Sequence, residues 1–149
     1  MTIKSSVFIL SLFLNSVLAY SQPAVRSLDA GFITNPKPIV LYFHTDWCSY
    51  CAIQSEQIKK DTSISKMLNN SFYFIDFNAE SKEQIIFNGK NYKEDKNSTH
   101  EFVKSFFPKR KPIAYPAWVI LDKNYSLIFS HEGLIKPEKL KKIFALIPN

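Results

Sequence analysis

The chain has 149 residues, a formal net charge of +6 and a hydrophobic fraction of 46%, with 13 phenylalanines but only two cysteines. This composition excludes a disordered chain, and it excludes a secreted scaffold held together by several disulfides, because such scaffolds are rich in cysteine. The basic residues do not alternate with aromatic ones, so we interpret them as a solvated face and expect no nucleic-acid partner.

The N-terminus has the parts of a secretory signal peptide. A lysine precedes a mostly apolar stretch from Val7 to Leu18, and small residues follow, with cleavage expected after Ala19. Cleavage would leave about 130 residues, the size of one domain. We therefore expect export to the periplasm or secretion, and an uncleaved N-terminal anchor is the alternative. The expected division of the chain is a signal peptide at 1–19, an N-terminal extension at 20–35 and one domain at 36–149.

The apolar pattern then predicts alternating strands and helices. Residues Ala24 to Ala30 are expected to form a short helix before the break at 35–38. The continuous apolar run from Ile39 to His44 predicts a strand buried on both faces, and Ser49 to Lys60 predicts a helix. The next predicted elements are a helix at 64–68 capped by Thr62 or Ser63 and a strand at 72–77.

An Asn-Gly pair separates two β-favouring segments after this second strand. Asn88-Gly89 is a strong hairpin signal and predicts paired strands at 84–87 and 90–92. The remaining predicted elements are a helix from Ser98 or Thr99 to about Phe107, an antiparallel pair of strands at 117–121 and 126–131, and a closing helix from Pro137 with Leu140, Ile143, Phe144 and Ile147 on one face. This order predicts an α/β fold, in which a mixed sheet is covered by helices on both faces.

The two cysteines carry the clearest chemical signal. Cys48 and Cys51 are separated by two residues at the predicted junction of the first strand and its helix. A helix N-terminus stabilises a thiolate, and two thiols at this spacing can close a small disulfide. The loop that they close is too short to stabilise the fold much, so the pair indicates chemistry or metal binding. Dithiol–disulfide exchange is the favoured interpretation, and a static disulfide or a soft-metal site is the alternative.

Three segments together resemble the thioredoxin superfamily over roughly Pro36 to Ile147. They are Trp47-Cys48-Ser49-Tyr50-Cys51, the run Tyr115-Pro116-Ala117-Trp118, and the late hairpin with its terminal helix. Among the subgroups, the chain looks like the exported thioredoxin-like proteins and the periplasmic disulfide-interchange domains. The resemblance implies a thioredoxin-like mixed β-sheet flanked by helices, with a β-hairpin and a helix inserted before a cis-proline loop.

The resemblance also implies roles for individual residues. Cys48 would be the attacking thiolate and Cys51 the buried resolving thiol. Pro116 would be cis and would face the disulfide, while the backbone of Tyr115 would pair with an extended substrate segment. Trp47 either supports the loop by packing or offers an apolar surface to substrates.

Several residues near the cysteines leave alternatives open. Tyr42 stands where many thioredoxins have a buried acid, so protons would have to move through water or another group. His44 either lowers the pKa of Cys48 as an imidazolium or points into a helix-covered layer. Asp46 either caps the helix or is exposed, and Trp118 is expected in the core.

We therefore expect a thiol–disulfide oxidoreductase that exchanges disulfides with protein substrates. A reductase is favoured; in an oxidising compartment it needs a membrane-bound electron donor, and neither a cofactor nor a metal is expected. The protein is expected to be a monomer. The alternatives are a protein disulfide oxidase or isomerase, a copper chaperone using the same two thiols, and an interaction protein whose thiols are incidental.

Overall fold

The computed structural model describes residues 25–95, 99–109 and 112–148. The predicted signal peptide, Ala24 and Ser98 lie outside these residues. The elements, in chain order, are β1 (Val25–Ser27), the 3₁₀ helix η1 (Phe32–Thr34), β2 (Ile39–His44), α1 (Ser49–Lys60), α2 (Thr62–Ser71), β3 (Tyr73–Asn78), β4 (Gln84–Phe87), β5 (Lys90–Tyr92), α3 (Glu101–Phe106), β6 (Ala117–Leu121), β7 (Leu127–Glu132) and α4 (Pro137–Leu146).

Strand β2 lies in the middle of a mixed four-stranded sheet with the order β3-β2-β6-β7. It runs parallel to β3 and antiparallel to β6, and β6 pairs antiparallel with β7. The first five residues of β2 are buried and only His44, its last residue, is half-buried, so the prediction of a strand buried on both faces is confirmed. Strands β1, β4 and β5 form a separate three-stranded sheet.

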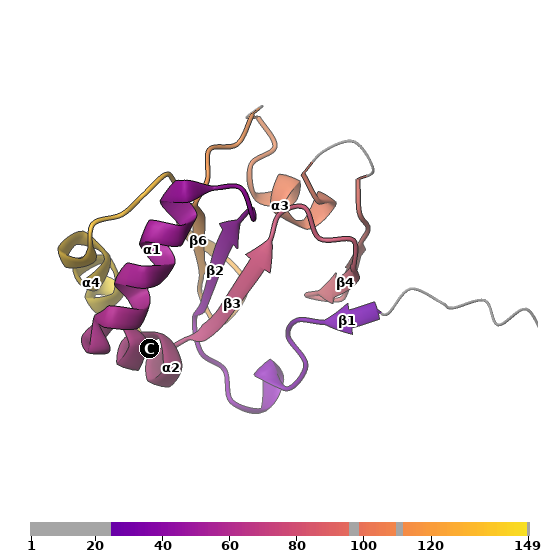
Figure 1. Ribbon diagram of the computed structural model, residues 1–149. Helices are drawn as coiled ribbons and strands as arrows, with labels where there is room; N and C mark the ends of the chain where they lie inside the picture. The colour runs from indigo at the N-terminus through magenta and orange to yellow at the C-terminus, as the bar shows by residue number, and fades with distance from the viewer. Residues whose placement is uncertain (1–24, 96–98, 110–111, 149) are drawn as a thin grey trace, which may run out of the picture.

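Alternate residues of β2 contribute to two cores on opposite faces of the main sheet, because successive side chains of a strand point to opposite faces. Val40 and Tyr42 pack in the core that includes residues of α2 and α4. Leu41 and Phe43 pack in the core that includes residues of β4, β5 and α3. Figure 1 shows the same division, with α1, α2 and α4 on one side of the sheet and α3, β1 and β4 on the other. The predicted α/β architecture is confirmed.

The predicted hairpin is present as β4 and β5, which pair antiparallel. Its two turn residues, Asn88 and Gly89, have φ angles of 49° and 69°. A two-residue turn of this kind needs positive φ at both positions, which asparagine and glycine adopt at low cost. The hairpin does not extend the main sheet. Strand β4 pairs with β5 on one side and with β1 on the other, so the hairpin belongs to the three-stranded sheet.

Three local predictions are wrong. Residues 25–27 form a strand rather than part of a helix, because they pair in parallel with β4 and lack an apolar helical face. The helix predicted at 64–68 runs from Thr62 to Ser71, and its cap is Asp61, whose carboxylate accepts hydrogen bonds from two backbone N–H groups. The cap of α3 is His100, whose imidazole accepts a hydrogen bond from the N–H of Phe102 at 3.1 Å.

Within the described part of the chain, none of the helices has the length and apolar character needed to cross a membrane.

Candidate redox-active site

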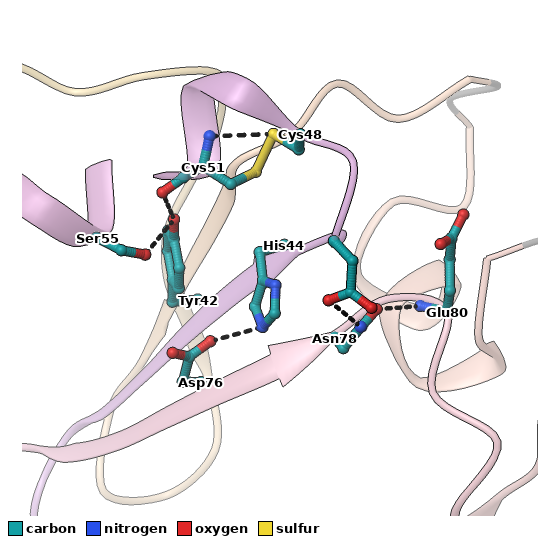
Figure 2. Close-up of polar contacts among 9 residues, drawn as sticks. Tyr42, His44, Cys48, Cys51, Ser55, Asp76, Asn78 and Glu80 are labelled. Carbon is teal, nitrogen blue, oxygen red and sulfur yellow. Dashed lines mark hydrogen bonds and ion pairs between the residues drawn. A yellow bond between two sulfur atoms is a disulfide. The ribbon is translucent and has the colours of Figure 1, made fainter. Parts of the chain in front are cut away.

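The two cysteines form a disulfide at the start of α1. Their Sγ atoms are 2.11 Å apart and their Cα atoms 5.2 Å apart. Cys48 is the N-cap residue of α1, and its sulfur accepts a hydrogen bond from the N–H of Cys51 at 3.1 Å (Figure 2). The N-cap position places the sulfur at the positive end of the helix, where a thiolate is stabilised once the disulfide is reduced.

The loop that contains Pro116 lies at the same end of the sheet. Phe43 pairs with Ala117, so Pro116 comes directly opposite the end of β2, where the chain turns toward Cys48. The Tyr115–Pro116 peptide bond is cis, as the resemblance to thioredoxins implies, and the Pro116 carbonyl accepts a hydrogen bond from the N–H of Gly133 at 2.7 Å. The rings of Trp47 and Tyr115 meet edge to face with centroids 6.4 Å apart, which joins this loop to the active-site turn.

The disulfide is surrounded by exposed apolar side chains. Cys48 and Cys51 are 8% and 3% exposed, whereas Trp47 is 70%, Tyr50 61% and Ile53 46% exposed. An open groove of about 610 Å³, lined largely by apolar atoms, runs along α1 from Ala52 and Ile53 to Lys60 and Pro137. An exposed apolar surface beside a buried disulfide is suited to binding part of a protein substrate.

Trp47 is exposed and also contacts the neighbouring loops, as expected for a residue that supports the active-site turn; its contact with substrates stays a prediction. Its indole N–H donates to the Glu80 carboxylate at 2.9 Å. The backbone N–H of Glu80 donates to the side-chain oxygen of Asn78, and the amide nitrogen of Asn78 donates to Asp46 at 2.9 Å. Asp46 is exposed and does not cap α1, because Cys48 occupies the cap position.

The polar side chains of Tyr42, His44 and Asp76 lie on the sheet face beneath the active-site turn. The Tyr42 hydroxyl donates to the carbonyl of Cys51 at 3.0 Å and lies 3.4 Å from the Ser55 hydroxyl. Nε2 of His44 lies 3.0 Å from the Asp76 carboxylate, as Figure 2 shows. Burial raises the pKa of Tyr42, and the hydrogen bond with Asp76 raises the pKa of His44. Tyr42 and His44 therefore favour the neutral phenol and the imidazolium, respectively.

Two further side chains hold the site in place, and sequence reasoning missed both contacts. The fully buried Gln54 amide donates to the carbonyl of Ile135 at 3.1 Å and accepts from its N–H at 2.8 Å. This pairing ties α1 to the segment before α4. The Tyr115 hydroxyl lies 3.1 Å from the hydroxyl of Thr99, just before α3. For the Gln54 contact, the sequence does contain a signal, which is a glutamine at a core-facing position of a predicted helix. For the contact between Tyr115 and Thr99, the sequence contains no such signal.

Among residues 25–95, 99–109 and 112–148, no group of three or more histidine, cysteine, aspartate or glutamate side chains is arranged to hold a metal ion. Trp118 is fully buried, as predicted for a core residue.

A thioredoxin-like fold whose first helix begins at a Cys-x-x-Cys disulfide, next to a cis-proline loop, defines a thiol–disulfide oxidoreductase. The chain belongs to the thioredoxin-like domain family, whose model matches residues 31–147. No curated protein sequence matches the chain significantly.

Solved structures with the same fold share little sequence with this chain. A disulphide isomerase from Xylella fastidiosa is 16% identical, covers 79% of this chain and 82% of its own, and has a TM-score of 0.53. The reduced C-terminal domain of DsbD from Neisseria meningitidis is also 16% identical, with 79% and 88% covered and a TM-score of 0.51. The exposed lipoprotein thioredoxin Etrx1 from Streptococcus pneumoniae is 15% identical, with 75% and 86% covered and a TM-score of 0.51. At these identities the similarity concerns the fold.

Proposed function

We propose that this protein is a disulfide reductase of an exported compartment, which reduces protein substrates through Cys48 and Cys51. The observation that carries the proposal is the disulfide at the N-terminus of α1, joined through the Trp47–Tyr115 contact to the cis-proline loop. The signal peptide expected at 1–19 supports export. The fold similarity to a DsbD domain and to an exposed lipoprotein thioredoxin supports a membrane-bound electron donor and a location outside the cytoplasm.

In the proposed reaction, the Cys48 thiolate attacks one sulfur of a substrate disulfide. The substrate S–S bond breaks, a Cys48–substrate disulfide forms, and the leaving sulfur takes a proton from solvent. Cys51 then loses its proton and attacks Cys48, which restores the Cys48–Cys51 disulfide and releases the second substrate thiol. The substrate gains two electrons, and a dithiol of the membrane donor returns two electrons to the protein.

Substrate binding is assigned to the apolar surface around the disulfide. Trp47 offers an exposed ring, and the backbone of Tyr115, next to the cis bond, is proposed to pair with an extended substrate segment. Pro116 is proposed to face the bound disulfide. The mature chain, which we propose begins after residue 19, acts as a monomer.

The reduction potential of the Cys48–Cys51 pair tests the direction of electron flow. The purified protein is equilibrated in glutathione or dithiothreitol buffers of graded potential, and the dithiol fraction is measured by alkylation. A value near roughly −270 mV supports a reductase, whereas one near roughly −120 mV would make the protein an oxidase. Failure to form the disulfide reversibly at any potential would refute the redox function and favour metal binding by the two thiols.

A trapping experiment tests the assignment of the two cysteines. In a Cys51→Ser variant the resolving thiol is absent, so mixed disulfides between Cys48 and substrate proteins accumulate. The matched control is Cys48→Ser, which keeps one cysteine but lacks the attacking one. Equal trapping by both variants would contradict the assigned roles, and no trapping by either would point to a protein whose thiols are incidental.

A further inference from the structure

The charge environment beneath the disulfide can be assigned residue by residue. Tyr42 is fully buried, and its hydroxyl donates to the carbonyl of Cys51. Burial raises its pKa, so the phenol is neutral and carries no charge toward the sulfurs. The position next to the first turn of α1 is thus filled by a group that anchors the helix but does not titrate with the cysteines.

His44, two residues further along β2, is the group beneath the turn whose charge changes with protonation, and its pKa is raised chiefly by the hydrogen bond with Asp76. Its Nε2 lies 3.0 Å from the carboxylate of Asp76 on β3, and its ring stacks on that of Tyr42 with centroids 6.0 Å apart. The side chain of His44 is 26% exposed and that of Asp76 is 51% exposed. In Figure 2 the imidazole lies between the active-site turn and Asp76.

The groups that face His44 come from each element around it. Tyr42 lies on its own strand, Asp76 on β3 and Asp46 on the loop that leads to α1. In Figure 2 the disulfide at the start of α1 lies above the imidazole, on the side away from Asp76. The hydrogen bond with Asp76 raises the pKa of His44 most, burial opposes this rise, and the charges of Asp76 and Asp46 add to it. Asp76 therefore keeps the imidazole protonated in the folded protein to a higher pH than in a free histidine.

The other two histidines of the chain are used elsewhere. His100 is buried beneath α3, where Nδ1 accepts from the N–H of Phe102 and Nε2 lies 2.9 Å from the carbonyl of Glu83. His131 lies on β7 and stacks on Phe129. Of the three histidines, His44 is the one beneath the active-site turn.

We propose that His44, held by Asp76, is the positioning residue whose positive charge stabilises the Cys48 thiolate in the reduced protein. This inference rests on the proposed function and names how its nucleophile is tuned. Reduction of the disulfide by a dithiol donor delivers two electrons and, with two protons from solvent, leaves two thiols; Cys48 then releases its proton to solvent. The disulfide is neutral, so the charge of His44 favours only the reduced, thiolate-bearing state.

The interaction between His44 and Cys48 can be measured on either residue, because a positive charge that stabilises the thiolate is equally stabilised by the thiolate. The pKa values of the three histidines are measured by proton NMR titration of the oxidised protein and of the protein reduced with dithiothreitol. We expect the pKa of His44 to rise on reduction by about half a unit, since Asp76 partly screens the charge.

The reciprocal measurement follows the Cys48 thiolate by its ultraviolet absorbance as the pH is raised. In a His44→Gln variant the pKa of Cys48 should rise by about the same half unit, whereas the matched control His131→Gln should leave it unchanged. An Asp76→Asn variant should lower the pKa of His44 in the oxidised protein, which tests the role of Asp76. If His44→Gln does not fold, the NMR titration of the unaltered protein still decides.

A pKa of His44 that is the same in both redox states, or that falls on reduction, would overturn the inference. So would a Cys48 pKa unaffected by His44→Gln. These results leave the proposed function standing as long as the disulfide forms reversibly in glutathione buffers. Loss of that reversibility in the unaltered protein would overturn the redox function first, and this inference with it.

Discussion

The pairing of Gln54 with Ile135 offers a sharp test of how the active-site helix is held. Gln54 is fully buried three residues after Cys51, and its amide satisfies both the N–H and the carbonyl of Ile135. A Gln54→Ala substitution leaves these two backbone groups without partners in a region that excludes water. Each unsatisfied buried group costs about 1–3 kcal/mol, and the higher helix propensity of alanine returns roughly 0.5 kcal/mol.

We expect Gln54→Ala to lower the free energy of unfolding of the oxidised protein by about 3 kcal/mol. Urea denaturation followed by circular dichroism measures this loss, and the slope of the transition shows whether unfolding stays two-state. The matched control is Gln57→Ala on the same helix, because Gln57 is only half-buried and contacts Gln54 at 3.3 Å; its loss should be within about 0.5 kcal/mol. A Gln54→Ala loss below about 1 kcal/mol would refute the reasoning.

A Gln54→Glu variant separates the hydrogen bonds from the side chain's volume. The carboxyl group still accepts from the N–H of Ile135, but it donates to the carbonyl only when protonated. Burial favours the protonated form and raises the pKa of the carboxyl group. The variant should therefore be most stable at low pH and lose stability as the pH rises through that raised pKa. A stability that does not vary with pH would contradict the proposed pairing.

Three further predictions concern single side chains. Tyr42→Phe removes the hydroxyl that donates into the first turn of α1 and should cost about 1 kcal/mol in urea denaturation; no measurable loss would show that this bond contributes nothing. His100→Ala removes the cap of α3 and leaves two backbone groups unpaired, so we expect a loss of about 2 kcal/mol, against a negligible loss for His131→Ala. Burial and the carboxylate of Asp29 raise the pKa of Tyr125 from 10.0 to about 12. The folded state thus favours the neutral phenol: the stabilisation is complete below pH 10.0 and lost as the pH rises through about 12. Tyr125→Phe should remove the step near pH 12 from the ultraviolet tyrosine titration.

Much of the fold could be predicted because its signals are local. The apolar run at 39–44, the Asn88-Gly89 turn and the Pro137 helix start each fix an element from neighbouring residues alone. The strand at 25–27 could not be predicted this way, because it exists through its pairing with β4, about sixty residues away in sequence. The sequence favours hydroxyl residues as the caps of α2 and α3, whereas in the structure Asp61 and His100, one residue away, accept the backbone N–H groups.

The same distinction between local signals and long-range strand pairing applies to the residues of the candidate site. The two cysteines and the cis bond at Pro116 follow from motifs, whereas the partners of Trp47 and His44 depend on which strands pair and in which register. Asp76 is the lone acidic residue in the otherwise apolar run of β3, which indicates that it has a polar partner. The identity of that partner, His44, could not be predicted without the strand register.

That register explains why the charge beneath the disulfide comes from two strands. In the parallel pair, Tyr42 lies beside Asp76 and His44 beside Asn78. Tyr42, His44 and Asp76 therefore share one sheet face, and His44 reaches Asp76 diagonally across the pair. A shift of β3 by one residue would turn Asp76 to the opposite face, into the core that contains Phe43, where a carboxylate would be buried without a partner. The apolar residues that fix the register of β2 and β3 thus also fix the position of the imidazole beneath the active-site turn.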